Sequence, residues 1–128
     1  MIDHTGVNVS NFEASREFYA AALAPLEYEL LHEFSASVTG FGSAASFGEA
    51  GKPDFWIGEG EVNTPRIHVA FHADTRQKVD AFYDAGLGVG GRDNGAPGPR
   101  PQYHPDYYGA FVLDPDGHNI EAVCHTPT

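Results

Sequence analysis

Two stretches of the sequence share one pattern of apolar and polar positions at a constant offset of 64 residues. A Phe-Tyr pair at 18–19 recurs at 82–83, and a leucine follows each pair about one turn later. Ser10 and Asp74 precede these stretches, and each is followed three residues later by Glu or Gln, as in a capping box. The pattern predicts two amphipathic helices. Because the offset is half of the chain length, it also indicates an internal duplication.

A strand is predicted before each helix. Around Val7 in the first copy and Val69 in the second, apolar residues alternate with other residues at a period of two. Such a strand turns its apolar side chains under the helix and its other side chains toward an open face. His4 and His68 are equivalent in the two copies, and both fall on this open face.

Further strands follow each helix. The sequence predicts them over residues 28–32, 37–42 and 54–57 in the first copy, and over 107–113 and 119–125 in the second. The intervening part of the second copy, 88–105, is rich in glycine and proline and predicts a long ordered loop around one short strand. The chain is therefore expected to form one α+β domain of two tandem modules, about 1–62 and 63–128.

A tight turn is predicted where Asp-Pro-Asp-Gly ends at Gly117. A type I turn with Gly117 in the left-handed conformation gives a three-residue hairpin loop. Counting back from this loop pairs Leu113 with Asn119 and Phe111 with Glu121. Because cross-strand partners share a face, we expect Glu121 to lie on the open face of its sheet.

The composition argues against several classes of function. Eighteen acidic residues against seven basic ones give a net charge of −11, which argues against binding to a phosphate backbone. No apolar run reaches the roughly 20 residues that a membrane helix needs, and we expect no signal peptide. The single Cys124 cannot form an internal disulfide, which is compatible with a reducing cytoplasm. A cytoplasmic protein is the expectation.

Three residues on open faces have the chemistry of a metal site. His4 and His68 lie on the first strands of the two modules, and Glu121 lies on a last strand. Two imidazoles and one carboxylate suit a divalent ion such as Fe²⁺, Mn²⁺, Ni²⁺ or Zn²⁺. The alternative is that each is an ordinary polar residue on a solvated sheet. The equivalence of the two histidines in the repeat favours the metal.

The chain resembles the vicinal oxygen chelate superfamily, which comprises glyoxalase I, extradiol dioxygenases, and bleomycin- and fosfomycin-resistance proteins. The matching segments run nearly end to end: the strand that follows His4, the segments 16–19 and 67–70, and the segment 114–121. The resemblance implies paired βαβββ modules that curl around a metal-holding cup. It also implies that His4, His68 and Glu121 are the metal ligands.

The sequence also departs from parts of this family. Glyoxalase I would require a fourth ligand on the last strand of the first module, where the offset from Glu121 gives Ile57, beside Trp56. Neither side chain binds a metal. Extradiol dioxygenases carry a tyrosine that faces the catechol, and Phe111 stands at that position. Bleomycin-binding relatives lack the metal ligands, whereas this chain keeps all three.

The loop that precedes the turn-forming hairpin offers further candidates. His104 is a candidate general acid or base, and Tyr107 is a second candidate catalytic residue. Arg100 is a candidate anchor for an anionic substrate, and Trp56 and Phe111 are candidates for its apolar wall. The alternative is that this loop is a rigid cover whose tyrosines pack on the sheet or on a partner subunit.

Two classes of function remain open. The first is a metal-dependent enzyme, dioxygenase-like or glyoxalase-like, acting on a small molecule with vicinal oxygens. The second is a protein that binds and sequesters a planar, antibiotic-type ligand without catalysis. In either class we expect a homodimer, because each module has one open face. Modules are exchanged between subunits in some relatives, and His4 of one subunit would then join the partner's site.

Overall fold

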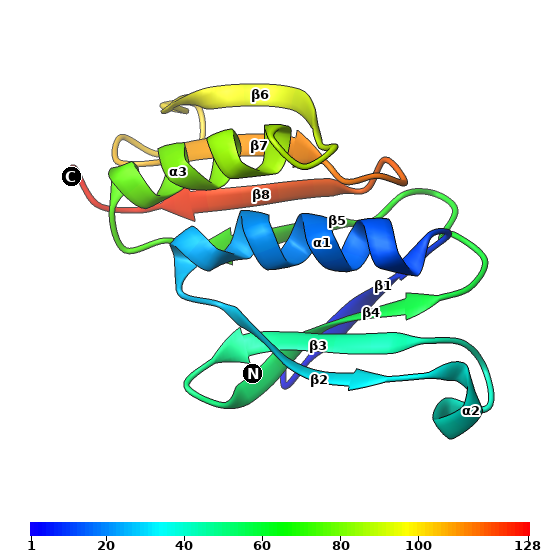
Figure 1. Cartoon of the computed structure of the whole chain (residues 1–128). Coiled ribbons are helices and arrows are strands. Elements are labelled where there is room, and N and C mark those ends of the chain that lie inside the picture. Colours follow the sequence, from blue (N-terminus) through cyan, green and yellow to red (C-terminus); the bar gives the residue numbers. More distant parts are fainter.

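The structure is a computed structural model that describes all 128 residues. Its elements are listed here in chain order: β1 (Thr5–Val9), α1 (Phe12–Leu23), η1 (Ala24–Leu26), β2 (Glu29–Phe34), α2 (Ala36–Thr39), β3 (Ala44–Glu49), β4 (Lys52–Glu59), β5 (His68–His72), α3 (Arg76–Leu87), β6 (Arg92–Pro99), β7 (Tyr108–Leu113) and β8 (Asn119–Cys124). They form two four-stranded mixed sheets, ordered β1-β4-β3-β2 and β5-β8-β7-β6 (Figure 1). The predicted α+β class with two tandem modules is confirmed.

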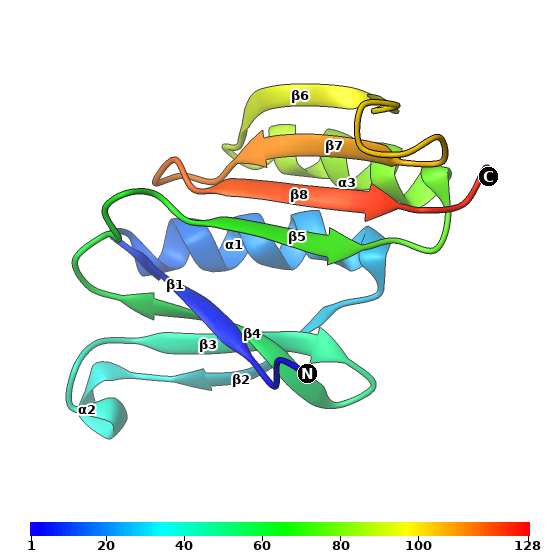
Figure 2. The ribbon, with the colours of Figure 1, turned by 180° about the vertical axis from the view of Figure 1, so that it is seen from behind.

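The two sheets do not close around a common cup within one chain. Each sheet keeps its first strand, β1 or β5, at one edge, and Figure 2 shows these two edges facing each other. The helices α1 and α3 lie side by side on one side of the two sheets, the side that faces the viewer in Figure 1. The predicted module boundary at residues 62–63 lies in the segment that joins β4 to β5.

The duplication is visible in the helices. α1 and α3 have 12 residues each, and their first residues, Phe12 and Arg76, stand at the predicted offset. The predicted caps were wrong by one residue in both copies. Asn11 caps α1 and Thr75 caps α3, each accepting from the backbone N–H three residues later. Both helices retain a side-chain cap, so the duplication extends to their first turns.

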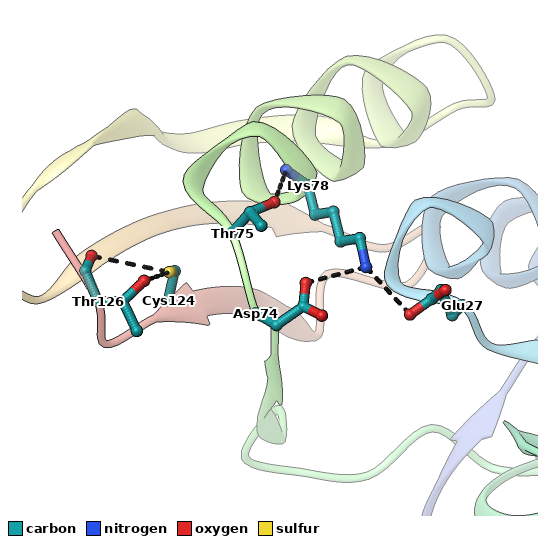
Figure 3. A network of polar contacts seen from close by, with 6 residues as sticks. All are labelled: Glu27, Asp74, Thr75, Lys78, Cys124 and Thr126. Atoms are coloured by element: carbon teal, nitrogen blue, oxygen red, sulfur yellow. Dashed lines mark hydrogen bonds and ion pairs between the residues drawn. The ribbon is translucent and has the colours of Figure 1, made fainter. Parts of the chain in front are cut away.

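The side chains that were predicted to cap have other partners. The Ser10 hydroxyl and backbone N–H both contact Asp116 of module two. Asp74 pairs with Lys78 Nζ at 2.9 Å, and Lys78 also reaches Glu27 at 3.0 Å (Figure 3). Lys78 therefore links the start of α3 to the end of η1 in module one. Both ion pairs are largely exposed, so each contributes little to stability.

The strand prediction failed in the middle of each module. Residues 37–42 were expected to form a strand, but they belong to the short helix α2 and the turn after it. The strand β3 follows instead, and its residues are buried on both faces, so it lacks the alternation that marks a half-buried strand. In module two, β6 is longer than the short strand expected and runs along the sheet edge, where proline is tolerated.

The hairpin prediction is confirmed. Leu113 pairs with Asn119 and Phe111 pairs with Glu121, in the predicted register. Gly117 has a φ of +90°, the left-handed conformation that the turn requires. This register places Glu121 on the face of the sheet that α3 does not cover.

A single core of 21 buried residues joins the two modules. Phe71 of β5 reaches into module one, where its ring packs against Phe55 and Tyr28 with centroids 5.2 and 5.4 Å away. No helix is long and apolar enough to cross a membrane. The lone Cys124 is buried and free.

We expect Tyr19→Phe to destabilise the protein by about 1–3 kcal/mol. The Tyr19 hydroxyl donates to Asp114 Oδ2 at 2.6 Å, and both side chains are fully buried. The variant removes the donor and leaves that carboxylate oxygen without it. Urea unfolding measures the effect. Tyr83→Phe, which removes an exposed bond to Asp93, is the matched control and should cost much less. Equal losses in the two variants would contradict the prediction.

Candidate functional site

The open face of the module-two sheet brings two predicted metal ligands together. His68 begins β5 and Glu121 lies in the middle of β8, its parallel neighbour. His68 Nε2 lies 2.9 Å from Glu121 Oε1. The Glu121 side chain is only 2% exposed, whereas that of His68 is 53% exposed. A buried carboxylate with an accessible imidazole at its surface can act as half of a metal site.

Tyr107 is the hydrogen-bond partner of the other oxygen of the Glu121 carboxylate. Its phenol donates a hydrogen bond to Glu121 Oε2, so both carboxylate oxygens have partners. Burial and this hydrogen bond raise the pKa of Tyr107 above its ordinary value. The phenol therefore stays protonated, and remains a donor, throughout the physiological pH range.

A cavity of about 530 Å³ opens over these residues. Its lining consists of His68, Tyr103, Tyr107, Phe111, Asn119 and Glu121. This volume suits a small molecule. Four of the six had been predicted as site residues. Asn119 had not, although its position two residues before Glu121 on one strand was the signal that could have found it.

His4 lies apart from this cavity. It precedes β1 in module one, its Nδ1 is 2.8 Å from Asp3 Oδ1, and its side chain is 60% exposed. Within one chain, no group of three or more His, Cys, Asp or Glu side chains is placed to hold a metal ion. The donors His68 and Glu121 fit a divalent ion by chemistry and by proximity. The third expected donor does not join them within the same chain.

Trp56 stands where a fourth ligand would be. Gly6 of β1 pairs with Trp56 of β4, just as Ala70 of β5 pairs with Glu121 of β8. Trp56 is therefore the module-one equivalent of Glu121, and the offset that pointed to Ile57 was wrong by one residue. The Trp56 ring stacks on Phe34, with centroids 6.3 Å apart. Module one supplies an aromatic wall at this position and no acidic donor.

The Arg100 side chain makes its hydrogen bonds to the preceding strand, β6. Its guanidinium donates to the carbonyls of Ala96 at 2.7 Å and Gly98 at 2.9 Å. The same group lies over the Phe111 ring, 5.5 Å from its centroid. Arg100 does not line the cavity. Its expected role as an anchor for an anion stays a prediction.

His104 is held by polar contacts on both ring nitrogens. Its Nδ1 accepts from the Asp106 backbone N–H at 3.1 Å, so Nε2 carries the proton and donates to His125 Nδ1 at 2.8 Å. The His104 and Tyr107 rings are in edge contact, with centroids 5.4 Å apart. His104 thus lies behind Tyr107 and does not line the cavity.

Comparison with known proteins identifies the family. The model of the Glyoxalase/Bleomycin resistance protein/Dioxygenase superfamily matches residues 1–122, so the chain belongs to this superfamily. The resemblance seen in the sequence is confirmed. A comparison with curated proteins gave no match.

Solved structures share the fold over nearly the whole chain. A glyoxalase/bleomycin resistance protein from Albidiferax ferrireducens is 27% identical, with a TM-score of 0.76 and 94% of this chain and 95% of that chain covered. A putative glyoxalase from Bacillus halodurans is 26% identical, with a TM-score of 0.69 and coverages of 97% and 95%. A mutant of the fosfomycin resistance protein FosX from Listeria monocytogenes, complexed with Mn(II) and 1S,2S-dihydroxypropylphosphonic acid, is 20% identical, with a TM-score of 0.70 and coverages of 98% and 90%.

Proposed function

We propose that this protein is a divalent-metal-dependent enzyme that acts on a small molecule with vicinal oxygens, through dioxygenase-like or lyase-like chemistry. The observation that carries the proposal is the contact between His68 and the buried Glu121 at the cavity over the module-two sheet. The FosX complex supports it, because a protein of the same fold binds Mn(II) and a dihydroxy compound. The 128 residues would work as one domain of two modules.

The residues of the site would have different roles in metal and substrate binding. His68 and Glu121 would hold the ion, and a bound divalent ion supplies Lewis-acid chemistry that polarises an oxygen of the substrate. Phe111 and Tyr103 would bind the body of the substrate, since both line the cavity. Trp56 supplies no acid, so the site would have three protein ligands and open positions for the substrate.

The third ligand, we propose, is His4 of a second copy of the chain. In one chain the side chain of His4 is exposed and paired only with Asp3. The surface of module one around α2 is also apolar, with Phe41 97% and Val38 70% exposed. Exposed apolar groups of this kind are typical of a protein interface. A homodimer would cover them and complete two sites.

The test is metal binding by the whole chain. We expect the protein to bind Mn²⁺, and we expect His68→Ala and Glu121→Gln to weaken binding by about 100-fold or more, since even residues behind the ligands contribute 10- to 100-fold. The electron paramagnetic resonance signal of free Mn²⁺ measures this. His72→Ala removes an imidazole from the same strand and should bind as the wild type does. Equal binding by all four proteins would contradict the proposed site.

A second candidate function is ligand sequestration without catalysis. It is favoured by the three aromatic side chains, Tyr103, Tyr107 and Phe111, among the six that line the cavity. Such a protein would bind a planar ligand equally well before and after treatment with a chelator. Under the enzyme hypothesis, chelation removes both activity and most of the substrate affinity.

A further inference from the structure

The loop between β6 and β7 is tied back on itself at several points. The Arg100 backbone N–H donates to the Tyr107 carbonyl at 2.8 Å, and the Tyr107 N–H donates to the His104 carbonyl at 3.1 Å. The Tyr103 N–H donates to the Arg100 carbonyl at 3.0 Å. The side chains of Arg100 and His104 add the bonds to Ala96, Gly98 and His125 described above. These contacts leave Tyr107 little freedom to change its position.

Tyr107 takes part in several of these contacts. Its ring also contacts the rings of Tyr103, His104 and His125, with centroid distances of 4.9, 5.4 and 5.4 Å. Its phenol ends on Glu121 Oε2. The loop thus carries a rigid hydrogen-bond donor to a carboxylate that would otherwise lie buried with one oxygen unpartnered.

Gly109 makes room for this arrangement. A Cβ atom at Gly109 would lie 3.2 Å from Tyr107 Cε1 and 3.3 Å from Glu121 Oε2. Either distance is tighter than an ordinary van der Waals contact. The absence of a side chain at this point of β7 therefore lets the Tyr107 ring cross the sheet to the carboxylate.

We infer that the loop 100–107 is a clamp that holds Tyr107 against Glu121, and that Tyr107 is a positioning residue for this metal ligand. The inference rests on the metal site of the proposed function. It assigns the His104 ring and the Arg100 backbone N–H to the support of Tyr107. A donor behind a ligating carboxylate fixes its orientation and typically contributes 10- to 100-fold to metal affinity.

The experiment compares Mn²⁺ dissociation constants of the whole protein. We expect Tyr107→Phe to weaken binding by about 10- to 100-fold. Gly109→Ala keeps the phenol but displaces the ring, and should weaken binding in the same direction. The control is Tyr108→Phe, because Tyr108 donates to Asp80 in a bond of the same kind away from the site. Thermal melting verifies that each variant is folded.

A double-mutant cycle tests the clamp itself. His104→Ala, which removes the ring that contacts Tyr107, should weaken Mn²⁺ binding in the wild-type background and have no further effect in the Tyr107→Phe background, because His104 would act through Tyr107. Additive losses, or an unchanged affinity in Tyr107→Phe while His68→Ala still abolishes binding, would overturn this inference alone. Failure of the wild-type protein to bind Mn²⁺ would overturn the inference and the proposed function together.

Discussion

Mixing the His4→Ala and His68→Ala proteins should restore the tight Mn²⁺ binding that each variant alone has lost. In the proposed dimer, each site takes His4 from one chain and His68 with Glu121 from the other. A heterodimer of the two variants contains one undamaged half from each chain, and these halves meet in a single complete site. A site built within one chain could not be restored in this way, because each chain in the mixture lacks a ligand.

The size of the recovery is fixed by symmetry. Random exchange makes half of the dimers mixed, and each mixed dimer has one complete site out of two, so about a quarter of the wild-type sites should return. His4→Ala mixed with Glu121→Gln should recover equally. The matched control is His68→Ala mixed with Glu121→Gln, which should recover nothing because both ligands belong to the same half. No recovery in any mixture, or a single 13.8 kDa species in sedimentation, would contradict the dimer.

Local turn chemistry made part of the fold predictable. The Asp-Pro-Asp-Gly turn needs a left-handed residue, Gly117 provides it, and the register of β7 and β8 follows by counting. That register alone placed Glu121 on the open face. The repeat located both helices for a similar reason, because their apolar stripes are imposed by the core they share.

Tertiary partners decided the features that the sequence did not reveal. Ser10 and Asp74 have side chains that can cap a helix. Ser10 contacts Asp116 of module two, and Asp74 pairs with Lys78 of α3, so the next residue caps the helix in each copy. β3 is covered on both faces, so no alternation marks it. These outcomes depend on which segments meet, and the periodicity of a single segment does not contain that information.

The candidate site also has features that follow from local sequence and features that depend on tertiary packing. His68, Tyr107, Phe111 and Glu121 could be grouped from the sequence because they belong to three strands or strand ends of one module. His4 could be recognised as the repeat equivalent of His68, but its distance from the others depends on how two modules pack. Arg100 was expected to anchor an anionic substrate, and this stays a prediction. The sequence did not indicate that its guanidinium also donates to carbonyls of β6, because these contacts depend on how the chain folds back after that strand.

One buried histidine adds hydrogen bonds to the joint between the two modules. His118 is fully buried, and its Nδ1 accepts from the Ile67 backbone N–H at 3.0 Å. The proton therefore lies on Nε2, which donates to the Asn8 carbonyl at 3.0 Å. Its own backbone N–H donates to Asp114 Oδ1 at 2.8 Å. One side chain thus ties the end of β1 in module one to the residue before β5 in module two.

We expect His118→Leu to destabilise the protein by about 2–6 kcal/mol, because two backbone groups lose their partner and each such loss costs about 1–3 kcal/mol. Leucine fills a similar volume, so the effect reports the lost hydrogen bonds more than a cavity. Urea unfolding measures it, and His32→Leu, which removes a half-buried imidazole from module one, is the control. The variant should also weaken Mn²⁺ binding, since Ile67 directly precedes His68 and its contact with His118 sets where β5 begins beside β8. Unchanged stability in His118→Leu would show that the core alone holds the modules together.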